Sequence, residues 1–155
     1  MAAAGLAHGC PSVAACRQYD AAFEGGVYHA VNCSGLAQLG DIPCGIPPNT
    51  TFSLDLAGNS MMALAGGMFA GLRIVAPAAA INLSGNCISN VPPVAFDGFA
   101  FSTDTTVSLD LSGNCITTVQ TNAFKALVGN ILIDLSSNDI TDLQPEAFSR
   151  RGWQA

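Results

Sequence analysis

One block of six residues recurs four times in this chain of 155 residues, and the recurrence constrains the fold more than any other feature. Each block has two apolar residues around an Asp or Asn, then two small residues and an Asn. The blocks are LDLAGN (54–59), INLSGN (81–86), LDLSGN (109–114) and IDLSSN (133–138). Their final asparagines are separated by 27, 28 and 24 residues. Repetition at such a period is typical of stacked-repeat proteins, in which each unit buries its apolar face against its neighbours.

Alternating apolar residues in each block predict a short strand with one face buried. We expect strands near 53–57, 80–84, 108–112 and 132–136, stacked at ~4.8 Å as a parallel sheet. A glycine before the asparagine in three blocks allows a sharp turn after the strand. The asparagine amides can then bond backbone groups that the sheet leaves unpaired. This predicts a structural asparagine ladder of Asn59, Asn86, Asn114 and Asn138.

The segments between the blocks also correspond from repeat to repeat. Ten residues after each ladder asparagine comes a phenylalanine, and we expect these side chains to stack as a spine: Phe69, Phe96, Phe124 and Phe148. The two longer intervals have their extra residues at 73–80 and 97–106. Insertions in repeat proteins go to loops on one face.

The repeats resemble the leucine-rich-repeat family, whose pattern is L-x-x-L-x-L-x-x-N-x-L. The first Leu of that pattern is absent, because Thr51, Ala78, Thr106 and Asn130 stand there, and we expect a weaker core at this layer. The resemblance implies an α/β repeat protein: a leucine-rich-repeat solenoid, or horseshoe, with a concave parallel β-sheet. It assigns residues 51–155 to four leucine-rich repeats.

Four of the six cysteines precede the repeats: Cys10, Cys16, Cys33 and Cys44. Residues 10–50 resemble the cysteine-rich N-terminal cap of extracellular leucine-rich-repeat proteins, which include adhesion receptors and the variable lymphocyte receptors of jawless fish. The family's third cysteine is missing and Cys44 is extra. The resemblance implies disulfides, and the four cysteines allow three pairings, which stay open. Before the cap, we expect residues 1–9 to be a leader or disordered.

The other two cysteines, Cys87 and Cys115, each follow a ladder asparagine directly. Stacking should place them about one strand spacing apart, within the Cα range that a disulfide tolerates. Either they bridge successive turns or they stay as two stacked thiols. A zinc site using His8 and His29 is the competing interpretation for the cap cysteines, but no C-x-x-C spacing supports it.

Composition excludes several functions. A net charge of −6 and a pI near 4.4 have the wrong sign for a nucleic-acid partner. The apolar stretch 61–81 contains three glycines, a proline and Arg73, so we expect no membrane span in it. No nucleotide, protease, kinase or calcium motif occurs, and a Cys33–His29 nucleophile is disfavoured in a cap. We therefore expect no enzyme activity, cofactor or metal.

Two columns of side chains should point outward from the stacked strands and form the candidate ligand-binding face. The first is Asp55, Asn82, Asp110 and Asp134; the second contains Ser84, Ser112 and Ser136. Acidic side chains a few ångström apart would attract a basic partner or a cation. The alternative is that Leu-Asp-Leu-Ser is simply common in the family.

The expected function is protein recognition through the concave face, by a cell-surface receptor or secreted adhesion protein. Six cysteines favour an oxidising, extracellular location. Of three glycosylation triplets, Asn49 is the best candidate to carry a glycan. The alternative is a structural spacer or oligomerisation segment without its own ligand, which would self-associate through an uncapped C-terminal end. A third possibility, an intracellular scaffold, requires all cysteines to be reduced.

Overall fold

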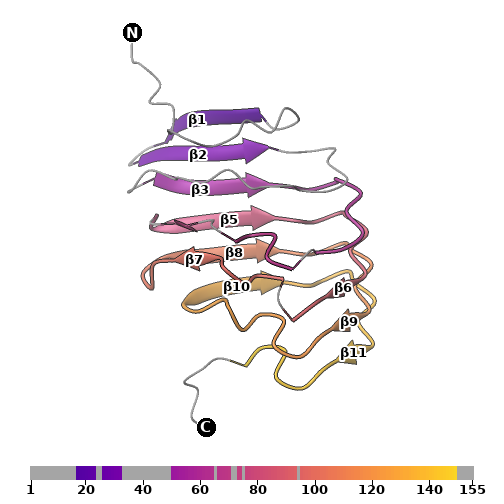
Figure 1. Cartoon of the computed structure of the whole chain (residues 1–155). Helices are drawn as coiled ribbons and strands as arrows, with labels where there is room; N and C mark the ends of the chain where they lie inside the picture. The colour runs from indigo at the N-terminus through magenta and orange to yellow at the C-terminus, as the bar shows by residue number, and fades with distance from the viewer. Residues whose placement is uncertain are drawn as a thin grey trace.

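A computed structural model describes residues 17–23, 26–32, 50–64, 66–70, 73–74, 76–93 and 95–149. These residues form a parallel β-solenoid of about three turns (Figure 1). Its main sheet has six strands in the order β1-β2-β3-β5-β8-β10. The strands are β1 (Arg17–Phe23), β2 (Gly26–Asn32), β3 (Thr50–Asp55), β5 (Ala78–Asn82), β8 (Thr106–Asp110) and β10 (Asn130–Asp134). β1 and β2 form an antiparallel pair, and β2 continues into the sheet parallel to β3.

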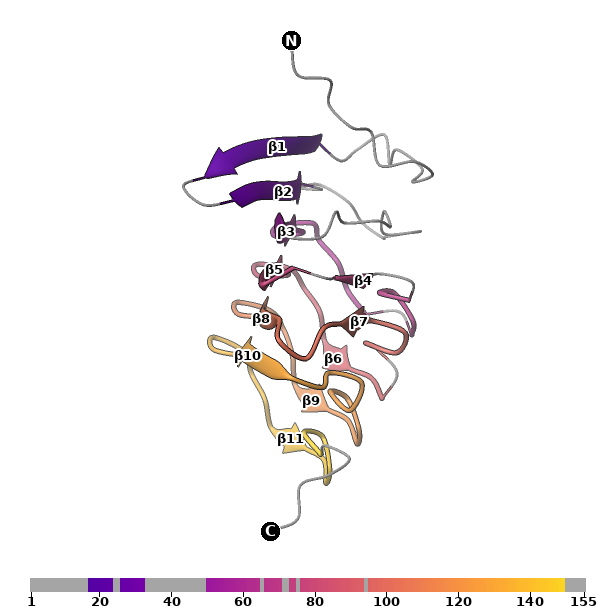
Figure 2. The same cartoon turned by 90° about the vertical axis from the view of Figure 1, so that its left-hand side faces the viewer.

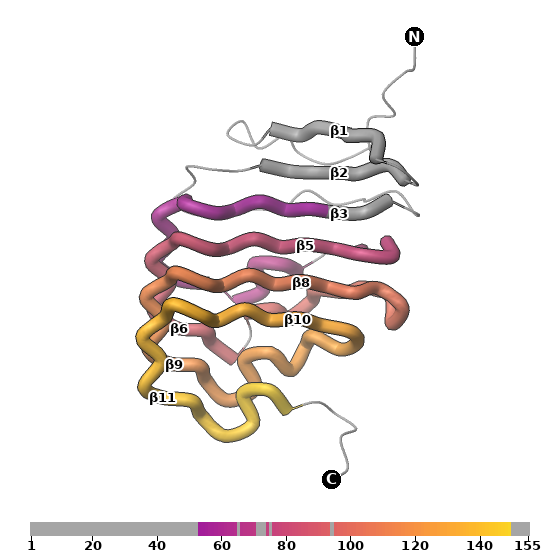
Figure 3. Tube along the Cα trace, turned by 180° about the vertical axis from the view of Figure 1, so that it is seen from behind, coloured from indigo at the N-terminus to yellow at the C-terminus, as the bar shows by residue number. Residues whose placement is uncertain are grey.

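Each of the four repeat strands begins two or three residues earlier than the sequence predicted, and each ends two residues earlier. The hydrogen bonds between coils nevertheless continue past the strand ends. The Leu56 amide donates to the Asn82 carbonyl at 2.7 Å, and the Gly58 amide to the Ser84 carbonyl at 3.0 Å. Each turn is thus bonded to the turn of the next coil, and the strands and turns stack in register (Figure 3).

Two smaller parallel sheets complete the coil. One contains β6 (Asn90–Val91), β9 (Thr118–Val119) and β11 (Asp142–Leu143); the other contains β4 (Arg73–Ile74) and β7 (Ala100–Phe101). Figure 2 shows the main sheet on one side of the coil and β4 and β7 on the opposite side. β4 and β7 lie in the two segments that we expected to be loop insertions. Because both segments belong to the longer repeats, they fall in register and pair with each other.

No helix occurs in the part of the chain that the structure describes, so the α/β class expected from the resemblance is not shown. The segments opposite the main sheet are made of turns with i to i+3 hydrogen bonds, such as the Phe99 amide to the Phe96 carbonyl at 3.1 Å. Left-handed residues interrupt them, including Gly98 and Asn122 with φ of 81° and 60°. Among the described residues, the structure has no helix with the length and apolar character needed to cross a membrane.

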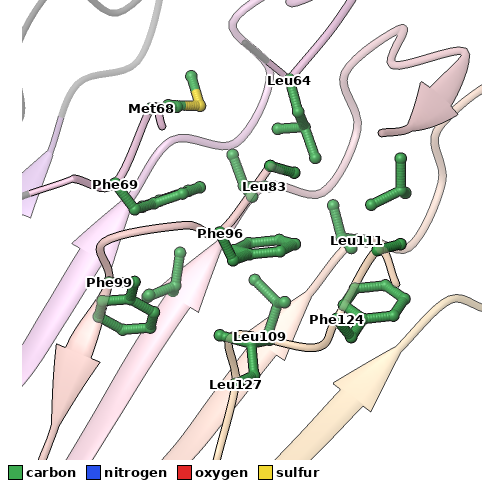
Figure 4. Packing of buried hydrophobic residues seen from close by; sticks show 14 of the residues in the cluster. Leu64, Met68, Phe69, Leu83, Phe96, Phe99, Leu109, Leu111, Phe124 and Leu127 are labelled. Carbon is green, nitrogen blue, oxygen red and sulfur yellow. The ribbon is translucent and has the colours of Figure 1, made fainter. Parts of the chain in front are cut away.

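The core lies inside the coil, where the inward residues of successive repeats pack in layers (Figure 4). Leu54, Ile81 and Leu109 are at most 2% exposed. The positions of the missing first Leu do not belong to the core, because Ala78 is only half-buried and Thr106 and Asn130 are exposed. The weaker core layer expected at these positions is therefore not found. The inward layer instead starts one residue later, with Ala79 and Val107 buried and Ile131 partly buried.

A stack of aromatic rings runs through the coil. The ring centroids are 5.2 Å apart for Phe69 and Phe96, 5.6 Å for Phe96 and Phe124, and 5.0 Å for Phe124 and Phe148. Offset stacking at such distances adds to the apolar burial of each ring. Within the described residues, the last ring of the stack is Phe148, which is 47% exposed.

The turn before each ladder asparagine gives a test of backbone strain. Gly58, Gly85 and Gly113 have φ between 61° and 64°, and Ser137 has φ of 54° at the same position of the last repeat. Left-handed backbone is costly for any residue with a Cβ. Gly113→Ala should lower the free energy of unfolding by about 1 to 2 kcal/mol. The added Cβ would meet only ordinary contacts, 3.7 Å from the Gly85 nitrogen, so the loss reflects conformation rather than a clash.

Ser137→Gly should instead raise the free energy of unfolding, by about 0.5 kcal/mol. Glycine relieves the strain of the left-handed backbone, but part of this gain is lost because glycine also has more freedom in the unfolded chain. Equilibrium urea unfolding measures both changes. Equal effects of the same sign would contradict the assignment of strain to Ser137.

Candidate functional site

The asparagines predicted as a ladder lie one above another at the corner that follows the main sheet, and their side chains bond adjacent coils. The Asn86 Oδ1 accepts hydrogen bonds from the amides of Asn59 at 2.7 Å and Met61 at 3.1 Å. Its Nδ2 donates to the carbonyls of Leu56 at 3.0 Å and Leu83 at 2.8 Å. One side chain therefore pairs backbone groups of two coils and fixes the edge of the sheet.

Asn114 and Asn138 repeat this arrangement one and two coils later. Their Oδ1 atoms accept from the amides of Ile88 and Ile116, at 3.2 and 3.1 Å. Their Nδ2 atoms donate to the carbonyls of the coil before and of their own coil. Asn59 is also buried, and its Nδ2 donates to the Ala57 carbonyl at 3.3 Å. The ladder is a rigid frame beside the outward face of the main sheet.

The acidic column, defined as Asp55, Asn82, Asp110 and Asp134, occupies the last position of four adjacent strands. The register pairs each member with the next, from β3 through β5 and β8 to β10. Neighbouring side chains are thus one strand spacing apart, about 4.8 Å. Asn82 separates Asp55 from Asp110, so the directly adjacent carboxylates are Asp110 and Asp134. Asp134 is exposed and the other three are half-buried.

Every member of the acidic column also shapes its own turn. The Oδ1 of each accepts the backbone amide two residues on, at 3.1 Å for Asp55, 3.0 Å for Asn82, 2.9 Å for Asp110 and 2.8 Å for Asp134. Such Asx turns explain why only Asp and Asn occur here. The turn uses one oxygen of each carboxylate, and a carboxylate has two acceptor oxygens. The column can therefore hold the turn and still present charge.

The serine column, Ser84, Ser112 and Ser136, supplies the amides that these Asx turns bind. The Ser84 hydroxyl donates to the Asn82 Oδ1 at 2.7 Å. The Ser84 carbonyl accepts from the Gly58 amide of the preceding coil at 3.0 Å. Ser84 and Ser112 are half-buried, whereas Ser136 is exposed. These serines belong to the turn as much as to the surface.

Two further outward columns were not predicted from the sequence, and they lie two and four residues before the acidic column. The central column is Ser53, Ala80, Ser108 and Leu132, and the outer column contains Ala78, Thr106 and Asn130. Continuing the period-2 alternation backward from the blocks would have found them. Small side chains cover the centre of the face as far as Leu132, which is 66% exposed on the last strand. A partner can thus approach the backbone of the sheet closely.

Charge is unevenly distributed in the repeats. Residues 50–149 include eight acidic side chains and two basic ones. The pKa of Asp134 is lowered by its hydrogen bond from the Ser136 backbone amide, and further by the Ser136 hydroxyl. Asp134 therefore stays ionised to lower pH than an ordinary aspartate.

This lowered pKa can be measured directly. NMR titration of the Asp134 carboxyl should give a pKa below the ordinary aspartate value. Ser136→Ala should raise it partway, since the backbone amide bond remains, and Ser112→Ala should leave it unchanged. Because the folded pKa is depressed, the stabilisation from this bond is present above the unfolded pKa and is lost as the pH falls through the folded pKa. An ordinary pKa in the unaltered protein would contradict this account.

Comparisons with known proteins do not identify a family: no protein-family model matches the chain, and no curated protein and no solved structure is significantly similar to it. The resemblance to leucine-rich repeats thus depends on the repeated residues themselves. The remaining predicted sites are Cys10, Cys16, Cys33, Cys44 and Asn49, and all five lie outside the described residues. Cys87 and Cys115 are exposed, with their sulfur atoms 2.9 Å apart.

Proposed function

We propose that this chain is an extracellular recognition module of the leucine-rich-repeat type, a horseshoe solenoid that binds a basic protein ligand through the concave face of its main sheet. The acidic column carries the proposal. Its three carboxylates stand in register on one face, beside a strip of small side chains. Carboxylates at fixed spacing favour a partner with lysine or arginine at matching spacing.

Rigidity supports binding over a purely structural role. The acidic side chains are held by Asx turns, and the turns are held by the asparagine ladder. Groups that are already ordered lose little conformational entropy when a ligand binds. The excess of acidic residues in the repeats would also speed the approach of a basic partner at low salt.

Neutralising the column without breaking its turns tests the proposal. Asn82 already forms the same Asx turn as its neighbours, so Asp110→Asn with Asp134→Asn should keep the fold. The matched control is Asp97→Asn with Asp142→Asn, which removes the same charge from exposed positions outside the main sheet. Arrayed secreted and cell-surface ectodomains serve as probes, and each binder is then measured with the three proteins at low and high salt.

For a binder whose affinity falls as the salt concentration rises, Asp110→Asn with Asp134→Asn should lower the affinity on the order of ten-fold. The control should lose less than two-fold, because its charges lie away from the face. Equal losses in both variants, or binding that neither variant changes, would overturn the proposal for this face.

The extracellular location is a separate part of the proposal, supported by six cysteines in a chain of this size. Expression of the full chain through a secretory pathway, followed by non-reducing mass spectrometry, tests it. We expect the cap cysteines to be oxidised and the peptide with Asn49 to carry a glycan. Fully reduced, secretion-incompetent protein would favour an intracellular scaffold instead.

The last described coil favours a second candidate function, self-association as a structural or oligomerisation segment. Leu132, Leu143 and Phe148 are 66%, 58% and 47% exposed there. A second copy could cover these side chains. Light scattering over a range of concentrations should then show a dimer that Leu143→Asp abolishes. A monomer at all concentrations would exclude this candidate.

A further inference from the structure

We propose that Cys87 and Cys115 form a disulfide that joins two successive coils on the outside of the solenoid. The two sulfur atoms are 2.9 Å apart, and both cysteines are exposed. A disulfide bond is about 2.05 Å long, so closing it needs a movement of about 0.9 Å. Both side chains face solvent, where small rotations of χ1 can supply that movement and where an oxidant can reach them.

The backbone around the pair suits a cross-link. The Cys115 amide donates to the Ile88 carbonyl at 3.1 Å, and the Cys87 amide donates to the Met61 carbonyl at 2.9 Å. Successive coils are therefore hydrogen-bonded at this corner with the spacing of parallel strands. That spacing, about 4.8 Å, lies within the Cα separation of roughly 4.4 to 6.8 Å found across disulfides.

Cysteines occur at this corner of the coil in the second and third repeats. Directly after the four ladder asparagines come Ser60, Cys87, Cys115 and Asp139. The pKa of the Cys115 thiol is raised by its hydrogen bond with Cys87, by desolvation, and by the charges of Cys87 and Asp139. The raised pKa keeps the Cys115 thiol protonated to higher pH than an ordinary cysteine.

Oxidation requires a partner, and a small disulfide such as oxidised glutathione can supply it. One of the two thiols releases its proton, and its thiolate attacks one glutathione sulfur, which breaks the glutathione S–S bond and expels a glutathione thiolate. The other thiol then loses its proton and attacks the first cysteine sulfur, which expels the second glutathione thiolate. The protein loses two electrons and two protons, and oxidised glutathione becomes two glutathione molecules.

The cross-link would add a covalent bond between two coils whose packing against each other is otherwise non-covalent. It closes a chain segment of 28 residues, which reduces the freedom of the unfolded state. It also acts on the interface between neighbouring repeats, from which a solenoid derives most of its stability.

Peptide mapping of the full chain tests the bond. The protein is refolded at low concentration with a glutathione redox buffer, alkylated without reduction and digested before aspartate residues. Cys87 and Cys115 then fall in separate peptides, 55–96 and 110–133, and neither contains another cysteine. We expect these two peptides to be joined, with a mass two hydrogens below their sum, and to separate on reduction. Alkylation of both thiols, glutathione left on either cysteine, or linkage to a cap cysteine or a second chain would overturn the proposal.

Thermal unfolding under oxidising conditions tests the effect on stability. The unaltered protein should melt about 5 to 10 °C above the double variant Cys87→Ser with Cys115→Ser, whose cap cysteines are intact. Ser60→Ala is a control at the equivalent position of the first repeat and should change the midpoint little. A joined peptide without a higher midpoint would overturn the stabilising role. If the double variant does not fold, the mapping of the unaltered protein still decides whether the bond forms.

Discussion

Asn86→Ala is expected to lower the free energy of unfolding by about 3 to 5 kcal/mol, a large part of the total stability of a domain this size. The Asn86 side chain pairs with the backbone of Asn59, Met61, Leu56 and Leu83. Removing it leaves several buried donors and acceptors without partners, and each unpaired group costs about 1 to 3 kcal/mol. Water that enters the gap recovers part of this cost. Equilibrium urea unfolding measures the change.

Asn130→Ala is the matched control for Asn86→Ala. Asn130 is exposed at the start of β10. Its replacement should change the free energy of unfolding by less than about 0.5 kcal/mol. Similar losses in the two variants would mean that the ladder amides contribute no more than ordinary surface residues, and the account of the ladder would be wrong.

Phe96→Ala is expected to lower the free energy of unfolding by about 3 to 5 kcal/mol. The Phe96 ring is 1% exposed and lies between those of Phe69 and Phe124. Its removal would leave a cavity that two neighbouring coils cannot close, because both are fixed by the ladder and the sheets. Thermal and urea unfolding of the variant, compared with the unaltered protein, give the loss.

Phe148→Ala makes the same chemical change at the end of the stack. Among the described residues, Phe148 stacks on one ring, that of Phe124, and it is 47% exposed. It should therefore cost about 1 to 2 kcal/mol, roughly half or less of the loss at Phe96. A larger loss at Phe148 than at Phe96 would show that stability is not built from the contacts between successive coils.

The repeated block predicted the solenoid because its information is local. Alternation around Asp110 indicates a half-buried strand, the left-handed Gly113 indicates the turn, and Asn114 indicates what satisfies the backbone there. Each of these signals acts within a few residues. The alternation and the asparagine occur in all four repeats, and the glycine occurs in three of them. The stacked sheet follows once copies of the unit are placed side by side.

Features that depend on two coils at once could not be predicted in this way. β4 and β7 pair because two successive repeats are lengthened by nearly the same amount, and neither segment indicates a strand by itself. The strand ends were also misplaced, since Leu56 continues the hydrogen-bond ladder after strand geometry has ended. The helical component implied by the resemblance requires a long segment without breaks, and Gly98 and Asn122 interrupt those segments with left-handed backbone.

The candidate site was predicted in position but not in its construction. The residues of the acidic column are where alternation placed them, yet their Asx turns were not foreseen, because a carboxylate that shapes its own turn has the same sequence signature as one that faces a ligand. The binding role therefore stays a proposal. Asn82 makes it testable, since it shows that charge and turn can be separated.

The unequal extent of the three sheets gives the solenoid a mechanical polarity. In the described part of the chain, the β4–β7 sheet joins the earlier coils, whereas the coil that contains β10 and β11 is attached through the other two sheets, Asn138 and a half-exposed ring. Under tension or warming, the winding nearest β11 should detach first and the earlier windings should follow as a more resistant block.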